Sequence, residues 1–90
     1  MIRKHIIFTG VVQGVGFRYY SIYKARSLGL TGWVQNLPDG TVEMEVQGRT
    51  VEIDELIHFL KNRPLVEIRR MDAKTIPLLD DEETFTEPDY

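Results

Sequence analysis

The sequence of ninety residues contains no cysteine. This absence excludes disulfide bonds, a thiol nucleophile and thiolate metal ligands, and it is typical of a reducing compartment. Long apolar runs are also missing. The N-terminal run Ile6–Phe8 is too short for the hydrophobic region of a signal peptide, and no segment is long enough for a transmembrane helix. We therefore expect a cytoplasmic protein with no membrane partner.

Positive charge is scarce as well. The chain has 11 Lys and Arg residues against 14 Asp and Glu residues, which gives a net charge of -3 at pH 7. This balance disfavours a broad nucleic-acid-binding surface, so any anion site must be a local pocket. A chain of this length buries only about 60–65% of its unfolded surface, so the core is small. We expect one domain spanning residues 1–90, acting as a monomer.

Metal ligands in a suitable pattern are absent too. His5 and His58 lie far apart in the sequence, and no third residue is spaced to complete a zinc site. The acidic run Asp80–Glu83 is typical of a solvated loop. We predict neither a metal nor a cofactor.

Glycine, in contrast, is concentrated in one stretch. Gly10, Gly14 and Gly16 fall within seven residues, after the apolar run Ile6–Phe8 and before a helical pattern that begins near Arg18. A glycine-rich turn between a strand and a helix can point several backbone N–H groups into one space, and the helix N-terminus adds a partial positive charge. This arrangement indicates a cradle for a small tetrahedral anion, with a guanidinium beside it.

Two known phosphate-binding motifs are also rich in glycine. A dinucleotide-binding motif needs a third glycine and a larger parallel sheet, and a Walker A motif needs Gly-Lys-Ser/Thr. Neither pattern is present. An anion-binding loop and a plain tight turn with a surface arginine both remain possible from the residues alone.

Hydrophobic periodicity predicts the order strand, helix, strand, strand, helix, strand. The strands are expected at 4–11, 30–35, 41–46 and 66–76, and the helices at 17–28 and 50–63. The apolar phase of the last of these strands shifts between Ile68 and Met71, which predicts a bulge. Phe85 predicts a short final strand. This order is that of an α+β, ferredoxin-like βαββαβ sandwich: an antiparallel sheet with two helices on one face.

The predicted helix ends have residues with suitable cap chemistry. Gly29 is expected to be the left-handed residue after the first helix, and Thr50 the N-cap of the second. Pro64 is expected to end the second helix.

Asn36 ends the second predicted strand, directly before a turn that contains Pro38, Asp39 and Gly40. Asn is common in turns, so a purely structural role is one possibility. In a ferredoxin-like sheet, however, the end of this strand could approach the glycine loop. An uncharged amide there can orient a water molecule without repelling a phosphate.

Two stretches resemble the signature motifs of the acylphosphatase family. FTGVVQGVGFR (Phe8–Arg18) resembles the first motif, and GWVQNLPDGTV (Gly32–Val42), closed by Gly48, resembles the second. The resemblance covers about residues 2–77. The stretch 83–88 departs from the family's clear final strand, and Leu37 stands where many relatives carry a small polar residue.

The resemblance implies hydrolysis of the carboxyl–phosphate bond of acyl phosphates, giving a carboxylate and inorganic phosphate without a metal or a covalent intermediate. By position, Arg18 matches the phosphate-binding arginine, Asn36 the water-orienting asparagine and Thr41 a supporting threonine. The backbone of the cradle would come from Gln13, Gly14, Val15, Gly16, Phe17 and Arg18.

Two alternatives remain. The first is a non-catalytic anion-sensing or RNA-recognition-like module, although the strand 41–46 offers no aromatic side chains for base stacking and carries two acidic residues. The second is an inactive copy of the domain, of the kind fused within larger maturation enzymes.

Overall fold

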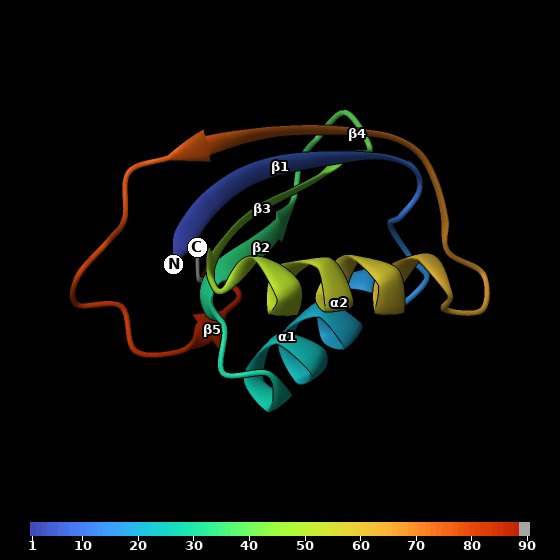
Figure 1. Ribbon diagram of the computed structural model, residues 1–90. Coiled ribbons are helices and arrows are strands. Elements are labelled where there is room, and N and C mark those ends of the chain that lie inside the picture. The colour runs from blue at the N-terminus through green and yellow to red at the C-terminus, as the bar shows by residue number, and fades with distance from the viewer. Residues whose placement is uncertain (89–90) are drawn as a thin grey trace.

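The computed structural model describes residues 1–88 and follows the predicted order of elements (Figure 1). The elements are β1 (Ile2–Val11), α1 (Phe17–Ser27), β2 (Thr31–Asn36), β3 (Val42–Gly48), α2 (Thr50–Lys61), β4 (Glu67–Ile76) and β5 (Phe85–Thr86). Residues 89–90, which the predicted domain includes, lie outside the described residues.

The five strands form one sheet in the order β4-β1-β3-β2-β5. Both helices cover the same face of this sheet (Figure 1), as predicted for a ferredoxin-like fold. Strands β1 to β4 pair antiparallel, but β5 pairs parallel with β2. The sheet is therefore mixed. The physical reason is that residues 77–84 cross from β4, at one edge, to the opposite edge before β5 begins.

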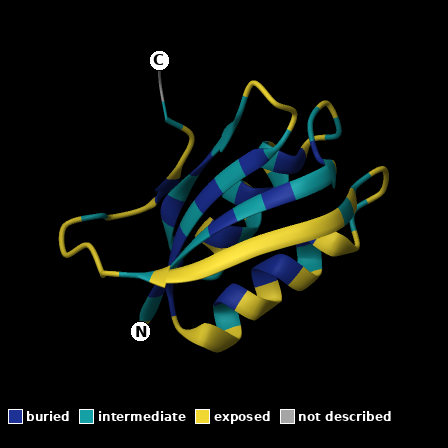
Figure 2. Ribbon diagram, turned by 90° about the horizontal axis from the view of Figure 1, so that it is seen from above, coloured by how far each residue is buried: buried dark blue, intermediate teal, exposed yellow. Residues whose placement is uncertain are grey.

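The core lies between the sheet and the helices, and each helix buries one face against the sheet. Helix α1 buries Phe17, Ser21 and Ala25. Helix α2 buries apolar residues spaced three or four positions apart, as one helix face requires, namely Ile53, Leu56, Ile57 and Leu60. Figure 2 shows that the central strands alternate between buried and partly exposed residues, whereas β4 is exposed along most of its length. The alternation turns every second side chain of a central strand toward the helices.

The predicted bulge is present and lies beside the glycine loop. Thr9 pairs with Arg70 and Gly10 with Ile68, so Arg69 is an extra residue on β4. Gly10 has φ +140°, and a Cβ there would lie 2.1 Å from the carbonyl oxygen of Glu67. Only glycine fits this close approach between strands, so Gly10 fixes how β1 leads into the loop.

The helix ends differ in part from the prediction. Gly29 has φ +73°, and the N–H of Leu30 donates to the carbonyl of Ala25 at 2.9 Å, so the predicted left-handed cap of α1 is confirmed. The predicted N-cap Thr50 is wrong. The N-cap is Arg49, because its backbone is extended and its carbonyl accepts the first helical bond from Ile53. Helix α2 also ends at Lys61, two residues before the predicted end.

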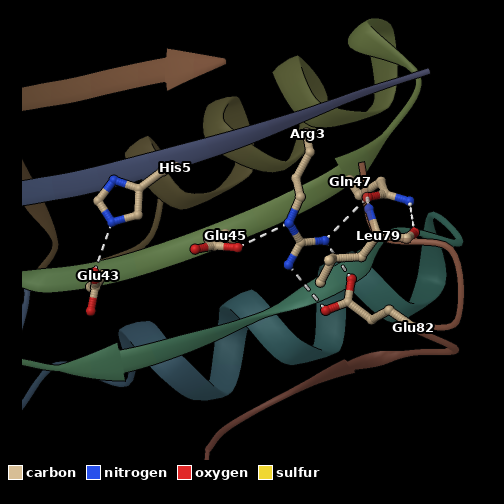
Figure 3. Close-up of polar contacts among 7 residues, drawn as sticks. All are labelled: Arg3, His5, Glu43, Glu45, Gln47, Leu79 and Glu82. Carbon is tan, nitrogen blue, oxygen red and sulfur yellow. Dashed lines mark hydrogen bonds and ion pairs between the residues drawn. The ribbon is translucent and has the colours of Figure 1, made fainter. Parts of the chain in front are cut away.

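Residues 77–84 are held against the sheet by Arg3, whose side chain is fully buried (Figure 3). Its Nε donates to Glu45 at 2.9 Å, and its Nη1 and Nη2 donate to the two carboxylate oxygens of Glu82 at 2.7 and 3.1 Å. Gln47 adds a bond to the carbonyl of Leu79. The acidic run is thus not a merely solvated loop, because Glu82 pairs with a buried guanidinium. These bonds hold the segment that directly precedes β5.

Candidate active site

Strands β1, β2 and β5 run in the same direction, so their C-terminal ends lie at the same edge of the sheet. The main candidate site lies at this edge. A cavity of about 310 Å³ opens there, next to the start of α1. It is lined by Val12, Gly14, Gly16, Phe17, Arg18, Tyr19, Ile22, Asn36 and Glu87. The topology therefore brings the glycine loop and Asn36, which lie on different strands, to one pocket.

The glycine loop presents its backbone to this cavity. Gly14 and Gly16 have φ values of +75° and +82°, which favour glycine. A Cβ on Gly14 would meet nothing within 4 Å, so the loop is open at that point. Gly16 is the N-cap of α1 and offers no side-chain cap. The first N–H groups of the helix lack partners within the helix and are available to an anion.

Arg18 lies in the first turn of α1 and lines the same cavity. Its side chain is 41% exposed, and its Nη1 donates to the carboxylate of Glu87. The guanidinium is a planar fork with several donors, so it can bind two oxygens of a tetrahedral anion at once.

Asn36 is the last residue of β2 and faces the cavity. Its side-chain oxygen is buried and has no hydrogen-bond partner among the described residues. A buried acceptor without a partner costs about 1–3 kcal/mol, so such atoms are usually found where a ligand or a water molecule completes the bonding. The unpaired buried oxygen therefore indicates a binding role for Asn36 more specifically than its position before a turn does.

Gln13 connects the two halves of the site. Its Nε2 donates to the carbonyl of Leu37 at 2.8 Å and to the carbonyl of Thr41 at 2.9 Å. The side chain of Gln13 therefore holds the turn after β2 against the glycine loop. This contact fixes the position of Asn36 relative to the cradle.

Thr41 does not line the cavity. Its hydroxyl donates to Asp39 at 2.6 Å, and its N–H donates to the same carboxylate at 3.0 Å. The hydroxyl bond from Thr41 holds the pKa of Asp39 below its usual range. Thr41 thus shapes the turn next to Asn36. Val15 also stays outside the lining, because its side chain packs against the core.

Glu87 is a charged residue of the site that the sequence did not predict, and the apolar wall residues Val12, Tyr19 and Ile22 were not predicted either. Glu87 follows the short strand β5 and reaches Arg18, which is 69 positions away in the sequence. No periodicity or motif marks it. Its place follows from β5 lying beside β2, a pairing that only the structure shows.

Within residues 1–88, no three His, Asp or Glu side chains lie close enough to hold a metal ion. No helix in this range is both long and apolar enough to cross a membrane.

Together, the fold and the pocket define a class: ferredoxin-like α+β domains with a glycine loop, a guanidinium and an amide at the ends of adjacent strands. The comparison with family models goes further, since the acylphosphatase model matches residues 4–87. The chain belongs to the acylphosphatase family. It is therefore an enzyme of the hydrolase class that acts on acyl phosphates. The match includes the C-terminal stretch, where the sequence resemblance was weakest.

Individual relatives agree with this assignment. An acylphosphatase from Bifidobacterium longum is 43% identical over 82 residues, covering 90% of this chain and 84% of the relative. The crystal structure of acylphosphatase from Bacillus subtilis superimposes with a TM-score of 0.88 at 31% identity, covering 98% of this chain and 99% of that one. The structure of T. kodakarensis HypF matches with a TM-score of 0.83 at 36% identity, covering 100% of this chain but 12% of HypF.

Proposed function

We propose that Arg18 and the glycine loop bind the phosphoryl group of an acyl phosphate, and that Asn36 orients the attacking water. The observation that carries this proposal is that Arg18, Gly14, Gly16 and Asn36 line one cavity. The products are a carboxylate and inorganic phosphate, formed without a metal or a covalent intermediate.

The cradle supplies charge and position. Backbone N–H groups of residues 13–18 surround the equatorial oxygens, and Arg18 binds two of them through its fork. Such donors stabilise the charge that builds up on the transferring phosphoryl group. Arginine is better suited than lysine here, because an ammonium keeps the charge but loses the planar fork.

Asn36 supplies the nucleophile's position. Its buried oxygen accepts a hydrogen bond from the water, which places the water in line with the bond to the leaving carboxylate. The amide is neutral, so it does not repel the phosphoryl dianion as a carboxylate would. Thr41 supports this geometry through the turn that carries Asn36.

The leaving group explains why a general acid is not required. Carboxylic acids have pKa values near ~4, so the carboxylate leaves without being protonated first. Positioning and charge stabilisation are then sufficient for the reaction.

The test is release of inorganic phosphate from acetyl phosphate by the purified protein, in the presence of EDTA. Arg18→Ala should lower kcat/KM by about 30- to 1000-fold, which corresponds to roughly 2–4 kcal/mol of transition-state stabilisation. Arg18→Lys should recover only part of this loss. Arg70→Ala, which removes an exposed arginine of β4, is the matched control and should leave the rate unchanged.

Near-normal turnover by Arg18→Ala, or a strict metal requirement, would contradict the mechanism. Complete inactivity of the wild-type protein would instead favour the alternative of an inactive copy of the domain. We also expect residues 1–90 to act as one domain and a monomer, which analytical ultracentrifugation would test.

A further inference from the structure

The phosphoryl site restricts where the rest of the substrate can lie. In an acyl phosphate, the acyl carbon is joined to the phosphorus through one oxygen. A phosphoryl group held by Arg18 therefore places the acyl group against the wall of the same cavity. Two side chains of that wall, Tyr19 and Ile22, come from the outer side of α1.

Tyr19 and Ile22 also line a second cavity of about 310 Å³, which they share with Tyr23 and Arg26. The lining of this second cavity is almost wholly apolar. The two cavities are thus neighbours along α1, with Tyr19 and Ile22 lining both. Arg26 also lines the second cavity, and its Nε donates to the carbonyl of Phe85 at 2.9 Å.

The rings of Tyr19 and Tyr23 each pack against another aromatic ring and still keep much exposed surface. Tyr19 packs edge-on against Tyr20 with ring centroids 5.5 Å apart, and Tyr23 lies 6.5 Å from Phe59. Yet Tyr19 remains 68% exposed and Tyr23 59% exposed. Rings held in this way lose little conformational freedom when they bind a partner, and exposed aromatic surface gains most from being covered by another ring.

Resting on the proposed function, we propose that Tyr19 and Ile22 form the subsite for the acyl group, and that this subsite selects aromatic acyl phosphates. An aromatic acyl group covers the ring of Tyr19 and the side chain of Ile22, and it removes their apolar surface from water. An acetyl group is too small to cover both. Tyr19 is thus a specificity-determining residue of the site.

The experiment compares kcat/KM for benzoyl phosphate and acetyl phosphate, because acetyl phosphate reports the chemistry without the subsite. The quantity measured is the change of the benzoyl-to-acetyl ratio on mutation, which cancels the intrinsic reactivities of the two substrates. Tyr19→Ala should lower the ratio by about tenfold, mainly through KM for benzoyl phosphate, since about 55 Å² of lost apolar contact has this effect. Tyr19→Phe should keep the ratio, because the ring and not the hydroxyl makes the contact.

Val51→Ala is the matched control, because Val51 is an exposed apolar residue on α2, outside both cavities. It should leave both substrates unaffected. An unchanged ratio in Tyr19→Ala, or equal losses on both substrates, would overturn the acyl subsite while leaving the proposed function intact. Failure of the wild-type protein to hydrolyse acetyl phosphate would overturn the proposed function itself, and the subsite with it.

Discussion

The guanidinium of Arg18 donates to the carboxylate of Glu87, and both residues line the candidate site. Glu87 follows Phe85, which is fully buried and pairs with Gly32 of β2. The anchored Phe85 therefore holds the following residues beside α1, with one negative charge at Arg18. In the proposed mechanism a phosphoryl dianion competes with this carboxylate, because both would bind the same guanidinium and they repel each other.

Removing the negative charge of Glu87 should strengthen phosphate binding. Both side chains of the pair are about 40% exposed, so the pair is worth only about 0.2–1 kcal/mol. Glu87→Gln should accordingly lower the inhibition constant of inorganic phosphate by roughly 1.5- to 5-fold at low ionic strength, and by less at high salt. Competitive inhibition of acetyl phosphate hydrolysis measures this constant.

Glu83→Gln is the control for Glu87, because it changes the net charge equally from an exposed position outside the cavity. It should leave the inhibition constant within error of the wild-type value. Equal effects of the two substitutions would show that only the overall charge matters, and that Glu87 does not compete at Arg18.

Asn36→Ala should separate catalysis from binding. If Asn36 orients water, this variant loses about 100- to 1000-fold in kcat, while inorganic phosphate still binds through Arg18 and the loop. The unpaired oxygen of Asn36 is a cost to the fold, so the free energy of unfolding should stay constant or rise. Steady-state kinetics, phosphate titration and urea denaturation measure the three quantities.

Loss of phosphate binding in Asn36→Ala would assign Asn36 to the phosphoryl group and not to the water. Asn36→Asp tests the charge at this position, since a carboxylate there repels the phosphoryl dianion. It should weaken phosphate binding more than Asn36→Ala does, although its shape is closer to that of asparagine.

Arg3 should contribute more to stability than any exposed arginine. Its side chain is fully buried, while those of its partners Glu45 and Glu82 are 24% and 17% exposed. Arg3→Met leaves both carboxylates without their cation and frees residues 77–84, so we expect a loss of about 2–4 kcal/mol in urea unfolding. Arg49→Met removes a 73% exposed arginine from its pair with Glu52 and should cost less than about 1 kcal/mol. Equal losses would contradict the anchoring role of Arg3.

The features that the sequence predicted correctly have local signals. The helix stripes follow from apolar spacing, the cap at Gly29 from one glycine, and the bulge from a phase shift in β4. The order of elements also predicted that Arg18 and Asn36 lie at one site, because strand pairing in this fold determines which strand ends are neighbours.

The features that were missed depend on partners far along the chain. Glu87 lies 69 residues from Arg18, and Glu82 lies 79 residues from Arg3. The sequence pattern around a charged residue does not identify its partner. The acidic run was therefore predicted to be a solvated loop, although one of its residues pairs with a buried arginine. Likewise, the parallel pairing of β5 depends on how residues 77–84 cross the sheet, and two residues of strand carry no signal of direction.

The pair between His5 and Glu43 should make stability depend on pH in the acid range. The hydrogen bond from His5, at 2.7 Å, lowers the pKa of Glu43 below its usual value of 4.5, and the amide of Gln35 adds to this effect. A lowered carboxyl pKa contributes stability above the unfolded value, and that contribution is lost as the pH falls through the folded value. The free energy of unfolding should therefore fall below pH 4.5.

Glu43→Gln removes this titration and should flatten the same part of the curve. Urea unfolding at a series of pH values between 7 and about 3 measures the difference between the two proteins, since the slope counts the protons that unfolding takes up. Glu83→Gln again provides a control of equal charge and should follow the wild-type slope. Parallel curves for wild type and Glu43→Gln would mean that Glu43 titrates alike in the folded and unfolded chains, which the bond to His5 does not allow.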